Sequence, residues 1–435
     1  MKASFYNIYF VHRGKHFIYN TLTTSIVAVD QVSYNALKNS DIEILSKDVK
    51  EVLSLQRFLV DSNLDELAVY ECYYNSAQYG AISDELRLVI LPTYNCNLRC
   101  TYCFEDCAIH SLITDDAISE IVSFVNEQIA TNHLYRRVSI VLFGGEPLLC
   151  ASSCVKICKA IRGICSANNI EFETKIISNA TLISPGIIQD LFIPNKMRIQ
   201  ITMDGNEETH NNRRKHKNGK GTYEEIMGAI RLLNQYGLKD TIDLRINLDK
   251  NNIDSIEPVL ADVYDKVGYI YIGLLRAEGN NKEHLSDCIS DNEYILNYRP
   301  QLEPLFKKYG KKLHYASFGK KHSCALNSSN SFIIDCNLDV YKCDNLVGRQ
   351  EYSVGKLHNG KLQKNAQYYS QRSWSPLHFE RCRKCNRLPA CTSSCAFLCL
   401  SKNGSMNIPL CAVTETQLVN KIKQFIDNNV EHQAD

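Results

Sequence analysis

Hydrophobic residues in the central part of the chain follow two patterns, short apolar runs and helical periodicity. Strand-like runs that contain many β-branched residues occupy residues 86–94, 137–145, 172–180, 197–205, 241–249 and 268–276. Their length and composition suit strands that are buried on both faces. Between them, residues 115–130 and 223–237 carry apolar side chains at the spacing of amphipathic helices. The pattern therefore predicts six strands that alternate with helices.

This alternation indicates the class of fold. Helices that connect successive strands across the outside of a sheet make those strands parallel, in either an open sheet or a barrel. In both architectures the loops at the C-terminal ends of the strands can vary without disturbing the core. We therefore expect an α/β fold whose chemistry is located at these strand ends.

The first 85 residues show a different pattern. Short β-like runs between residues 5 and 30 are interrupted by Arg-Gly-Lys and by a turn rich in threonine. Residues 31–39 and 48–61 then have the periodicity of helices. This order predicts a small α+β domain ahead of the central strands.

Composition narrows the class of protein and its compartment. With 44% hydrophobic and 22% charged residues, the 435-residue chain resembles ordinary globular proteins. A formal net charge of +1 gives no electrostatic reason to expect a nucleic-acid or membrane partner. The sequence shows no signal peptide and no apolar run long enough to span a membrane, so we expect a cytoplasmic protein. Nineteen cysteines, an odd number, favour metal or cluster ligation over a complete set of disulfides.

Polar and glycine-rich motifs follow the predicted strands in order. Cys96, Cys100 and Cys103 come after the first strand, in "CNLRCTYC". The second strand ends in "FGGEP", where two glycines let the backbone approach a ligand and a glutamate can accept a hydrogen bond from an ammonium group. The third ends in "ISNAT", whose hydroxyl and amide groups can hold a ribose, and the fourth in "ITMDGNEETHNNRR". Each motif alone is weak evidence, whereas their order is specific.

Together the motifs resemble the radical S-adenosylmethionine (SAM) enzymes, and within them the branch with a cysteine-rich C-terminal SPASM extension. The resemblance rests on "CNLRCTYC", on "GGEP" beginning 41 residues after Cys103, on "TMDGNEETHNNR" and on the C-terminal cysteines. It implies a partial (β/α)6 TIM-like barrel over residues 86–310 and a SPASM domain over residues 311–435. Residues 1–85 resemble a winged-helix-like peptide-recognition domain in their order of elements.

The resemblance also implies a cofactor set. In the family, three cysteines bind a [4Fe–4S] cluster and leave one iron open for SAM, which is cleaved to methionine and a 5′-deoxyadenosyl radical. The implied cluster ligands are Cys96, Cys100 and Cys103. The residues implied to contact SAM are Tyr102 near adenine, Gly144, Gly145 and Glu146 near the ammonium group with Pro147 beside them, Ser178 and Asn179 near the ribose, and Thr202 and Arg245 near the carboxylate.

By the same resemblance, the C-terminal cysteines imply two auxiliary [4Fe–4S] clusters, and so three clusters in all. The first auxiliary cluster would use Cys324, Cys343 and Cys395, with Cys336 as the fourth ligand, and the second would use Cys382, Cys385, Cys391 and Cys411. One position departs from the pattern, because Leu338 stands where the family has glycine five residues before Cys343. This departure puts the shape of the turn before Cys343 in doubt.

Several alternatives remain open. Zinc would also accept cysteine ligands, and His110 is the only nearby candidate to complete a zinc site at the first motif. Cys150, Cys154 and Cys158 recur on one helical face, and we interpret them as buried apolar residues. The basic run at residues 213–221 is either a solvated loop or a docking place for an acidic part of the substrate.

The function implied by the resemblance is modification of a peptide. Asp344, directly after Cys343, stands where sulfatase-maturing relatives have a general base, although a turn residue would also fit. Residues 1–85 would take a leader peptide as an added strand, or would only cap the barrel. We expect a maturase that abstracts hydrogen from a ribosomally made precursor peptide and forms a thioether or another crosslink, with a flavodoxin or ferredoxin as electron donor. A sulfatase-maturing enzyme and a non-catalytic iron–sulfur or zinc scaffold are the alternatives.

Overall fold

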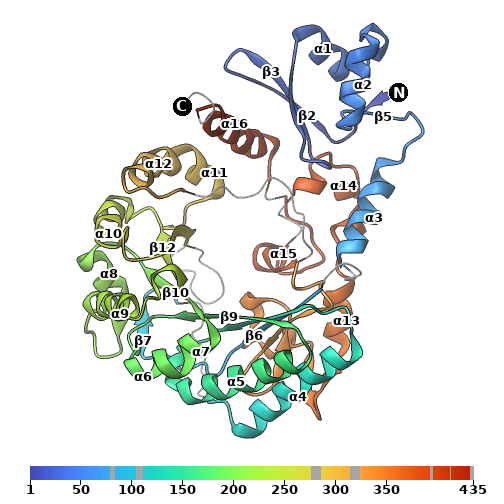
Figure 1. Ribbon diagram of the computed structural model, residues 1–435. Coiled ribbons are helices and arrows are strands. Elements are labelled where there is room, and N and C mark those ends of the chain that lie inside the picture. Colours follow the sequence, from blue (N-terminus) through green and yellow to red (C-terminus); the bar gives the residue numbers. More distant parts are fainter. Residues whose placement is uncertain are drawn as a thin grey trace. The chain divides into compact units, whose positions relative to one another are not determined.

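The computed structural model describes residues 1–78, 84–103, 111–275, 286–313, 324–391, 395–411 and 413–431 (Figure 1). The chain forms two compact units. The barrel unit consists of Ile82–His314 and Ser329–Arg372, and the terminal unit of Met1–Ala81, Tyr315–Ser328 and Ser373–Asp435. The terminal unit therefore contains both ends of the chain. The three predicted domains divide the chain differently, and their boundaries stay a prediction.

Six parallel strands form the centre of the barrel unit. They are β6 (Glu85–Ile90), β8 (Arg137–Leu142), β9 (Glu171–Ser178), β10 (Arg198–Met203), β12 (Ile242–Leu248) and β13 (Tyr269–Leu274). Their spatial order is β13-β12-β10-β9-β8-β6, and every neighbouring pair is parallel. Each of the six strands predicted from the apolar runs is present, which confirms the predicted partial barrel.

Helices follow the strands and cover the outside of the sheet (Figure 1). They include α4 (Asp115–Thr131), α5 (Ala151–Ala167), α8 (Glu207–Arg213), α9 (Tyr223–Gln235), α10 (Ile256–Val263) and α12 (Arg299–Lys308). The cysteine face of α5 points into the core, where Cys154 and Cys158 are fully buried. The interpretation of these cysteines as buried apolar residues is confirmed.

The sheet continues beyond β6 with residues from the region predicted as the C-terminal domain. β14 (Ser331–Ile334) pairs in parallel with β6, and β15 (Asp339–Tyr341), β16 (Gly355–His358) and β17 (Lys361–Lys364) extend it as an antiparallel meander. A separate two-stranded ribbon joins β7 (Leu98–Cys100) to β11 (Arg214–His216). This ribbon connects the first cysteine motif to the loop after β10.

The terminal unit contains a three-stranded antiparallel sheet of β2 (Asn7–His12), β3 (Lys15–Asn20) and β4 (Ile26–Val29). Helices α1 (Gln31–Asn39) and α2 (Lys47–Leu55) start at the N-caps Asp30 and Ser46. They bury Ile18 on one face of the sheet together with Leu37 and Leu53. The predicted order of strands and then helices is confirmed, except that residues 59–60 form the short strand β5, which pairs with β1 (Lys2–Ala3).

The other face of this sheet packs against the C-terminal part of the chain. Tyr19 and Ile8 form a hydrophobic cluster with Ala390 and with Leu418 and Ile422 of helix α16 (Glu415–Glu431), which lies beside β2 in Figure 1. Three polar contacts reinforce this packing. His12 Nε2 lies 2.6 Å from Asp427 Oδ1, Thr21 Oγ1 donates to the Asn386 carbonyl at 2.6 Å, and Arg383 pairs with Glu71 of α3 (Glu66–Gln78) at 3.1 Å.

Short elements complete the C-terminal segment of the described chain, namely α13 (Ala366–Ser373), α14 (Glu380–Arg383) and α15 (Ala396–Asn403). Among the described helices, none combines the length and the apolar character that crossing a bilayer requires.

Replacing Ile422 by alanine should loosen the N-terminal sheet as well as α16. Ile422 is fully buried, and truncating such a side chain to alanine costs about 2–5 kcal/mol. Hydrogen–deuterium exchange should show faster exchange of the β2 and β3 amides. Leu55→Ala, in the same unit but 80% exposed, is the matched control and should leave the exchange unchanged. Unaltered β2 and β3 protection in Ile422→Ala would contradict the shared core.

Candidate functional site

The first cysteine motif lies at the C-terminal end of β6 and is held by the β7–β11 ribbon. Cys100, the last residue of β7, is paired across the ribbon with Arg214. The Cys96 thiol accepts a hydrogen bond from the Leu98 backbone N–H at 3.4 Å, and the Cys103 N–H donates to the Cys100 carbonyl at 3.3 Å. Burial, with smaller contributions from nearby groups, raises the pKa of Cys96 to about 11. Forming a thiolate here therefore has a cost, which binding to a metal or cluster would offset.

The two glycines of "FGGEP" lie directly against this loop. A Cβ atom at Gly144 or Gly145 would come closer than 3.0 Å to the backbone oxygens of Thr93 and Asn95, and Gly144 has a φ of +122°. Backbone hydrogen bonds join the same segments, from Gly145 N to Thr93 O at 3.2 Å and from Glu146 N to Asn95 O at 2.8 Å. The end of β8 therefore positions the cysteine loop through backbone contact that only glycine permits.

Glu146 connects the ends of β8 and β9. Its side chain is fully buried, and its two carboxylate oxygens accept hydrogen bonds from Leu148 N at 3.0 Å, Ser178 Oγ at 2.8 Å and Asn179 N at 2.8 Å. Burial raises the pKa of this carboxyl, although the three donors oppose the shift. Pro147 directly follows and begins a short 3-10 helix, Pro147–Cys150. Glu146 therefore holds together the two strand ends that border the predicted SAM pocket.

Asn179 and the first cysteine motif are in contact. The Asn179 Nδ2 group donates to Asn97 Oδ1 at 2.9 Å and lies 3.8 Å from the Cys96 sulfur. The structure thus brings together Cys96, Glu146, Ser178 and Asn179, which the sequence placed on three different strand ends. Thr202 and Arg245 are also neighbours, since they are paired in register on β10 and β12. The contacts of these residues with SAM stay a prediction.

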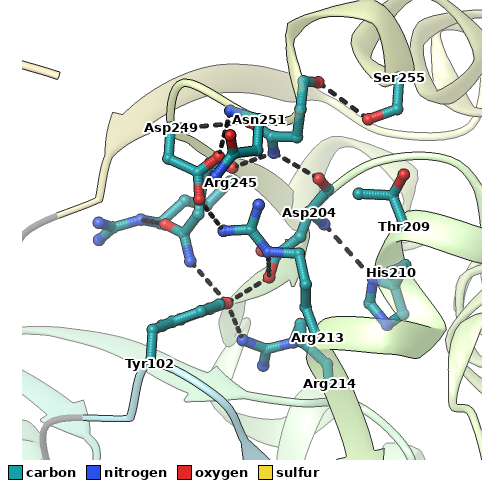
Figure 2. A network of polar contacts seen from close by, with 12 residues as sticks. Tyr102, Asp204, Thr209, His210, Arg213, Arg214, Arg245, Asp249, Asn251 and Ser255 are labelled. Atoms are coloured by element: carbon teal, nitrogen blue, oxygen red, sulfur yellow. Dashed lines mark hydrogen bonds and ion pairs between the residues drawn. The ribbon is translucent and has the colours of Figure 1, made fainter. Parts of the chain in front are cut away.

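Tyr102, within the cysteine motif, joins a buried polar network (Figure 2). Its hydroxyl donates to Asp204 Oδ2 at 2.5 Å and accepts from Arg214 Nη1 at 2.8 Å and from Asn247 Nδ2 at 3.0 Å. The Arg213 guanidinium lies over the Tyr102 ring, 5.3 Å from its centroid. The Tyr102 side chain therefore links the motif to the ends of β10 and β12.

Arginines and aspartates balance their charges in this network. Arg213 pairs with Asp249 at 2.8 Å and with Asp204 at 3.5 Å, and both carboxylates are almost entirely buried. His210 receives the Asp204 backbone N–H on Nδ1 at 3.4 Å, and its Nε2 lies 3.0 Å from the Thr222 hydroxyl. Burial, followed by the charges of Arg214 and Arg213, lowers the pKa of His210 to about 3, so this histidine is neutral.

Four of the C-terminal cysteines surround one cavity in the terminal unit. This cavity of about 280 Å³ is lined by the predicted ligands of the second auxiliary cluster, Cys382, Cys385, Cys391 and Cys411, and by Cys399, which the sequence did not single out. Burial, together with the other three predicted ligands, raises the pKa of Cys382 to about 11. Arg381 Nη2 lies 2.7 Å from the Cys411 sulfur.

The cysteines that line this cavity have the chemistry of cluster ligands. In the described part of the chain, no three His, Cys, Asp or Glu side chains converge closely enough to share a single metal ion. A four-iron cluster differs from a single ion because each thiolate binds a separate iron, so its ligands enclose a volume. Four cysteines around one cavity provide such an arrangement.

The ligands predicted for the first auxiliary cluster are divided between the two units. Cys324 and Cys395 belong to the terminal unit, whereas Cys336 and Cys343 belong to the barrel unit. Cys336 is buried in the barrel core, with its sulfur 3.6 Å from the Ser111 carbonyl oxygen. This ligand set stays a prediction.

The turn before Cys343 keeps a glycine-like shape despite its leucine. Leu338 has a φ of +68°, the left-handed conformation that glycine adopts most easily. The Asp335 side chain supports the turn by accepting hydrogen bonds from Asn337 N and Asp339 N, both at 2.9 Å. The sequence departure therefore leaves the backbone conformation of the turn intact.

Asp344 begins a short 3-10 helix, Asp344–Leu346, and is exposed to solvent. Loss of hydration among the surrounding protein atoms nevertheless raises the pKa of its carboxyl. Its role as a base stays a prediction.

His110, the candidate zinc ligand, lies outside the described residues.

Sequence reasoning missed Arg214, Asn247 and Asp249, and it misjudged part of the basic run. Arg213 and Arg214 point into the polar network, so the interpretation of residues 213–221 as a solvated loop is wrong for them. Lys217 and Lys220, farther along the run, are exposed as expected. The signal available in the sequence was the location of these residues, because Asn247 and Asp249 lie at the end of the strand predicted for residues 241–249.

A family model and several relatives match the chain. The model of the radical SAM superfamily matches residues 90–263. A cysteine-type anaerobic sulfatase-maturating enzyme of Clostridium novyi is 25% identical over 376 residues, which cover 79% of this chain and 95% of that protein. A serine-type anaerobic sulfatase-maturating enzyme of Klebsiella aerogenes is 23% identical over 296 residues, covering 61% and 68%.

Solved structures show the same fold. The structure of anSMEcpe with bound AdoMet and the Cp18Cys peptide has a TM-score of 0.59 at 18% identity, and the match covers 81% of this chain and 100% of that one. Streptococcus suis SuiB bound to S-adenosylmethionine has a TM-score of 0.57 at 14% identity, covering 95% and 99%. SuiB bound to the precursor peptide SuiA has a TM-score of 0.54 at 15% identity, covering 94% and 99%.

Gly145→Ala should weaken SAM binding by about tenfold or more, because the new methyl group must displace the cysteine loop. Gly163→Ala is the matched control. Gly163 lies within α5, an added Cβ there meets nothing within 4 Å, and alanine should stabilise the helix by about 1 kcal/mol. Equilibrium dialysis of the two anaerobically reconstituted proteins against labelled SAM measures the difference. Equal affinities would contradict the positioning role of the glycine backbone.

Proposed function

We propose that the chain, an enzyme whose residues 90–263 match the model of the radical SAM superfamily, is a maturase that oxidises a ribosomally made precursor peptide. The reaction would abstract a hydrogen from the peptide and form a thioether or another crosslink. The observation that carries this proposal is the N-terminal sheet, whose β4 edge pairs with no other described strand, in a chain that matches SuiB over 95% of its length.

The residues around the first motif fit the cofactors of the superfamily. We assign Cys96, Cys100 and Cys103 to the [4Fe–4S] cluster, which together with SAM supplies an electron and a 5′-deoxyadenosyl radical. The carboxylate of Glu146 already accepts three hydrogen bonds from the chain. We therefore assign Glu146 to shaping the pocket, and the backbone of Gly144 and Gly145 to contact with the SAM ammonium group.

Further SAM contacts are assigned to the neighbouring strand ends. Asn179, beside Cys96, would meet the ribose region, and Thr202 with Arg245 would meet the carboxylate. Two auxiliary clusters would be bound by the C-terminal cysteines, the second in the cavity lined by Cys382 and its neighbours. A flavodoxin or ferredoxin would supply the electrons.

The edge of β4 is the proposed place for a leader peptide. Within the described residues, β4 pairs with β3 on one side and with no strand on the other. Asn20 N donates to Ser25 O at 2.9 Å, and hydrogen-bonded pairs alternate along an antiparallel ladder. The backbone groups of Ile26 and Ala28 consequently point toward the unpaired edge, where an extended peptide can add a strand.

A second candidate function is maturation of sulfatases. The relatives from Clostridium novyi and Klebsiella aerogenes carry that name, and Asp344 directly follows Cys343 as the resemblance requires of a base. The leader site proposed on β4 distinguishes the two candidates, because the sulfatase-maturing candidate assigns no peptide contact to the N-terminal sheet.

The cluster content can be counted. Anaerobically reconstituted protein should bind about 12 iron atoms if three four-iron clusters form, and the Cys96, Cys100 and Cys103 triple alanine variant should lose about four of them. The Cys154→Ala variant changes a buried cysteine outside every proposed ligand set and should keep the wild-type iron content. Stoichiometric zinc without absorption near 400 nm would contradict the cluster assignment.

Ala28→Pro should weaken capture of the precursor peptide by about tenfold, because proline removes an outward-pointing N–H while sparing the bonds between β3 and β4. Fluorescence anisotropy with a labelled peptide, taken from a short reading frame next to the gene, measures the affinity. Ala28→Thr retains the N–H and is the matched control.

A point variant is preferable to deleting residues 1–85, because Ile8 and Tyr19 share a core with Leu418 and Ile422. SAM cleavage without peptide should be equal in Ala28→Pro, Ala28→Thr and the wild type. Equal peptide affinity in all three proteins would remove the support for leader binding at β4 and would favour the sulfatase-maturing candidate.

A further inference from the structure

Arg214 is a cationic residue of β11 that contacts the thiol-bearing strand of the β7–β11 ribbon. It faces Cys100 across that ribbon in backbone register. Its Nη1 group donates to the Tyr102 hydroxyl at 2.8 Å, so it contacts the motif on both sides of Thr101.

The surroundings of Arg214 differ from those of its neighbour Arg213. Arg213 forms ion pairs with Asp204 and Asp249. Within the described residues, Arg214 has no carboxylate at ion-pairing distance, and its Nε–H is buried without a hydrogen-bond partner. A buried N–H of a cation without an acceptor has lost its hydration and gained no hydrogen bond in return. An acceptor supplied by a bound group would offset that loss.

We propose that the buried charge and the unpartnered Nε–H of Arg214 favour the reduced form of the cluster held by Cys96, Cys100 and Cys103. The inference rests on the cluster site assigned under the proposed function. It concerns an electrostatic role of this side chain, separate from the ligands themselves.

The physical basis is the charge of the cluster. Reduction adds one negative charge to a group already bound by three thiolates, and a fixed positive charge nearby stabilises the added charge. Net charge, hydrogen bonds to sulfur and solvent exposure set the reduction potentials of iron–sulfur clusters. Buried charges are screened much less than exposed ones, so Arg214 should act more strongly than any exposed cation of the same ribbon.

Arg99 provides the matched control. It precedes Cys100 on β7, belongs to the same ribbon and carries the same charge, but its side chain is exposed. Arg99→Met and Arg214→Met therefore remove one guanidinium each, the first from solvent and the second from the buried network. Arg214→Lys keeps the charge and removes the planar set of N–H donors.

The experiment is a redox titration monitored by electron paramagnetic resonance on the full-length, anaerobically reconstituted proteins. The signal that changes when SAM is added identifies the cluster of the first motif. Arg214→Met should lower the midpoint potential of this signal, Arg214→Lys should lie between that variant and the wild type, and Arg99→Met should match the wild type.

The outcomes distinguish this inference from the proposed function. If the wild-type protein gives no SAM-dependent signal, both fail. If it gives one, an Arg214→Met potential equal to that of Arg99→Met overturns the electrostatic role alone. If the Arg214→Met protein cannot retain the cluster, the Arg214→Lys protein decides between a role of charge and a structural role. Retention with a potential close to the wild type supports the role of charge, whereas equal loss of the cluster in both variants overturns it in favour of a purely structural role.

Discussion

The close contact between the Gly144–Gly145 backbone and residues 93–95 is the constraint on which the site depends. Because no Cβ fits there, the end of β8 and the cysteine loop bond as two backbones, at 3.2 Å and 2.8 Å. Glu146 then extends the same rigid contact to the end of β9 through Ser178 and Asn179. One side of the motif is thereby fixed by backbone contacts.

The opposite side of the motif is fixed by buried polar groups. Tyr102 joins Asp204 and Arg214, and the ion pairs of Arg213 keep two buried carboxylates compensated. Such networks are costly when incomplete, because an unpaired polar group in a low-dielectric interior loses its hydration without return. Asp204 Oδ1, like Arg214 Nε, is buried without a hydrogen-bond partner. Two buried polar atoms without partners suit a site that receives another polar group.

The local hydrophobic pattern predicted the barrel because each of its strands has its own apolar run. The order of the motifs along the chain predicted which residues lie at the strand ends. The β7–β11 ribbon could not be predicted this way, since it pairs Cys100 with Arg214 over more than 100 residues and its strands are three residues long. The basic composition of residues 213–221 suggested a solvated loop. Pairing of β11 with β7 instead directs Arg213 and Arg214 into the polar network. The leucine at position 338 put the shape of the turn before Cys343 in doubt. Its φ of +68° nevertheless keeps the left-handed conformation that glycine adopts most easily.

The central claim is that this scaffold holds SAM for reductive cleavage, and product formation tests it most directly. Reconstituted protein is incubated anaerobically with SAM and dithionite, and 5′-deoxyadenosine and methionine are quantified by liquid chromatography and mass spectrometry. The account predicts that both products form in equal amounts and that neither forms when Cys103 is replaced by alanine. Protein that carries its iron and binds SAM but releases neither product would contradict it.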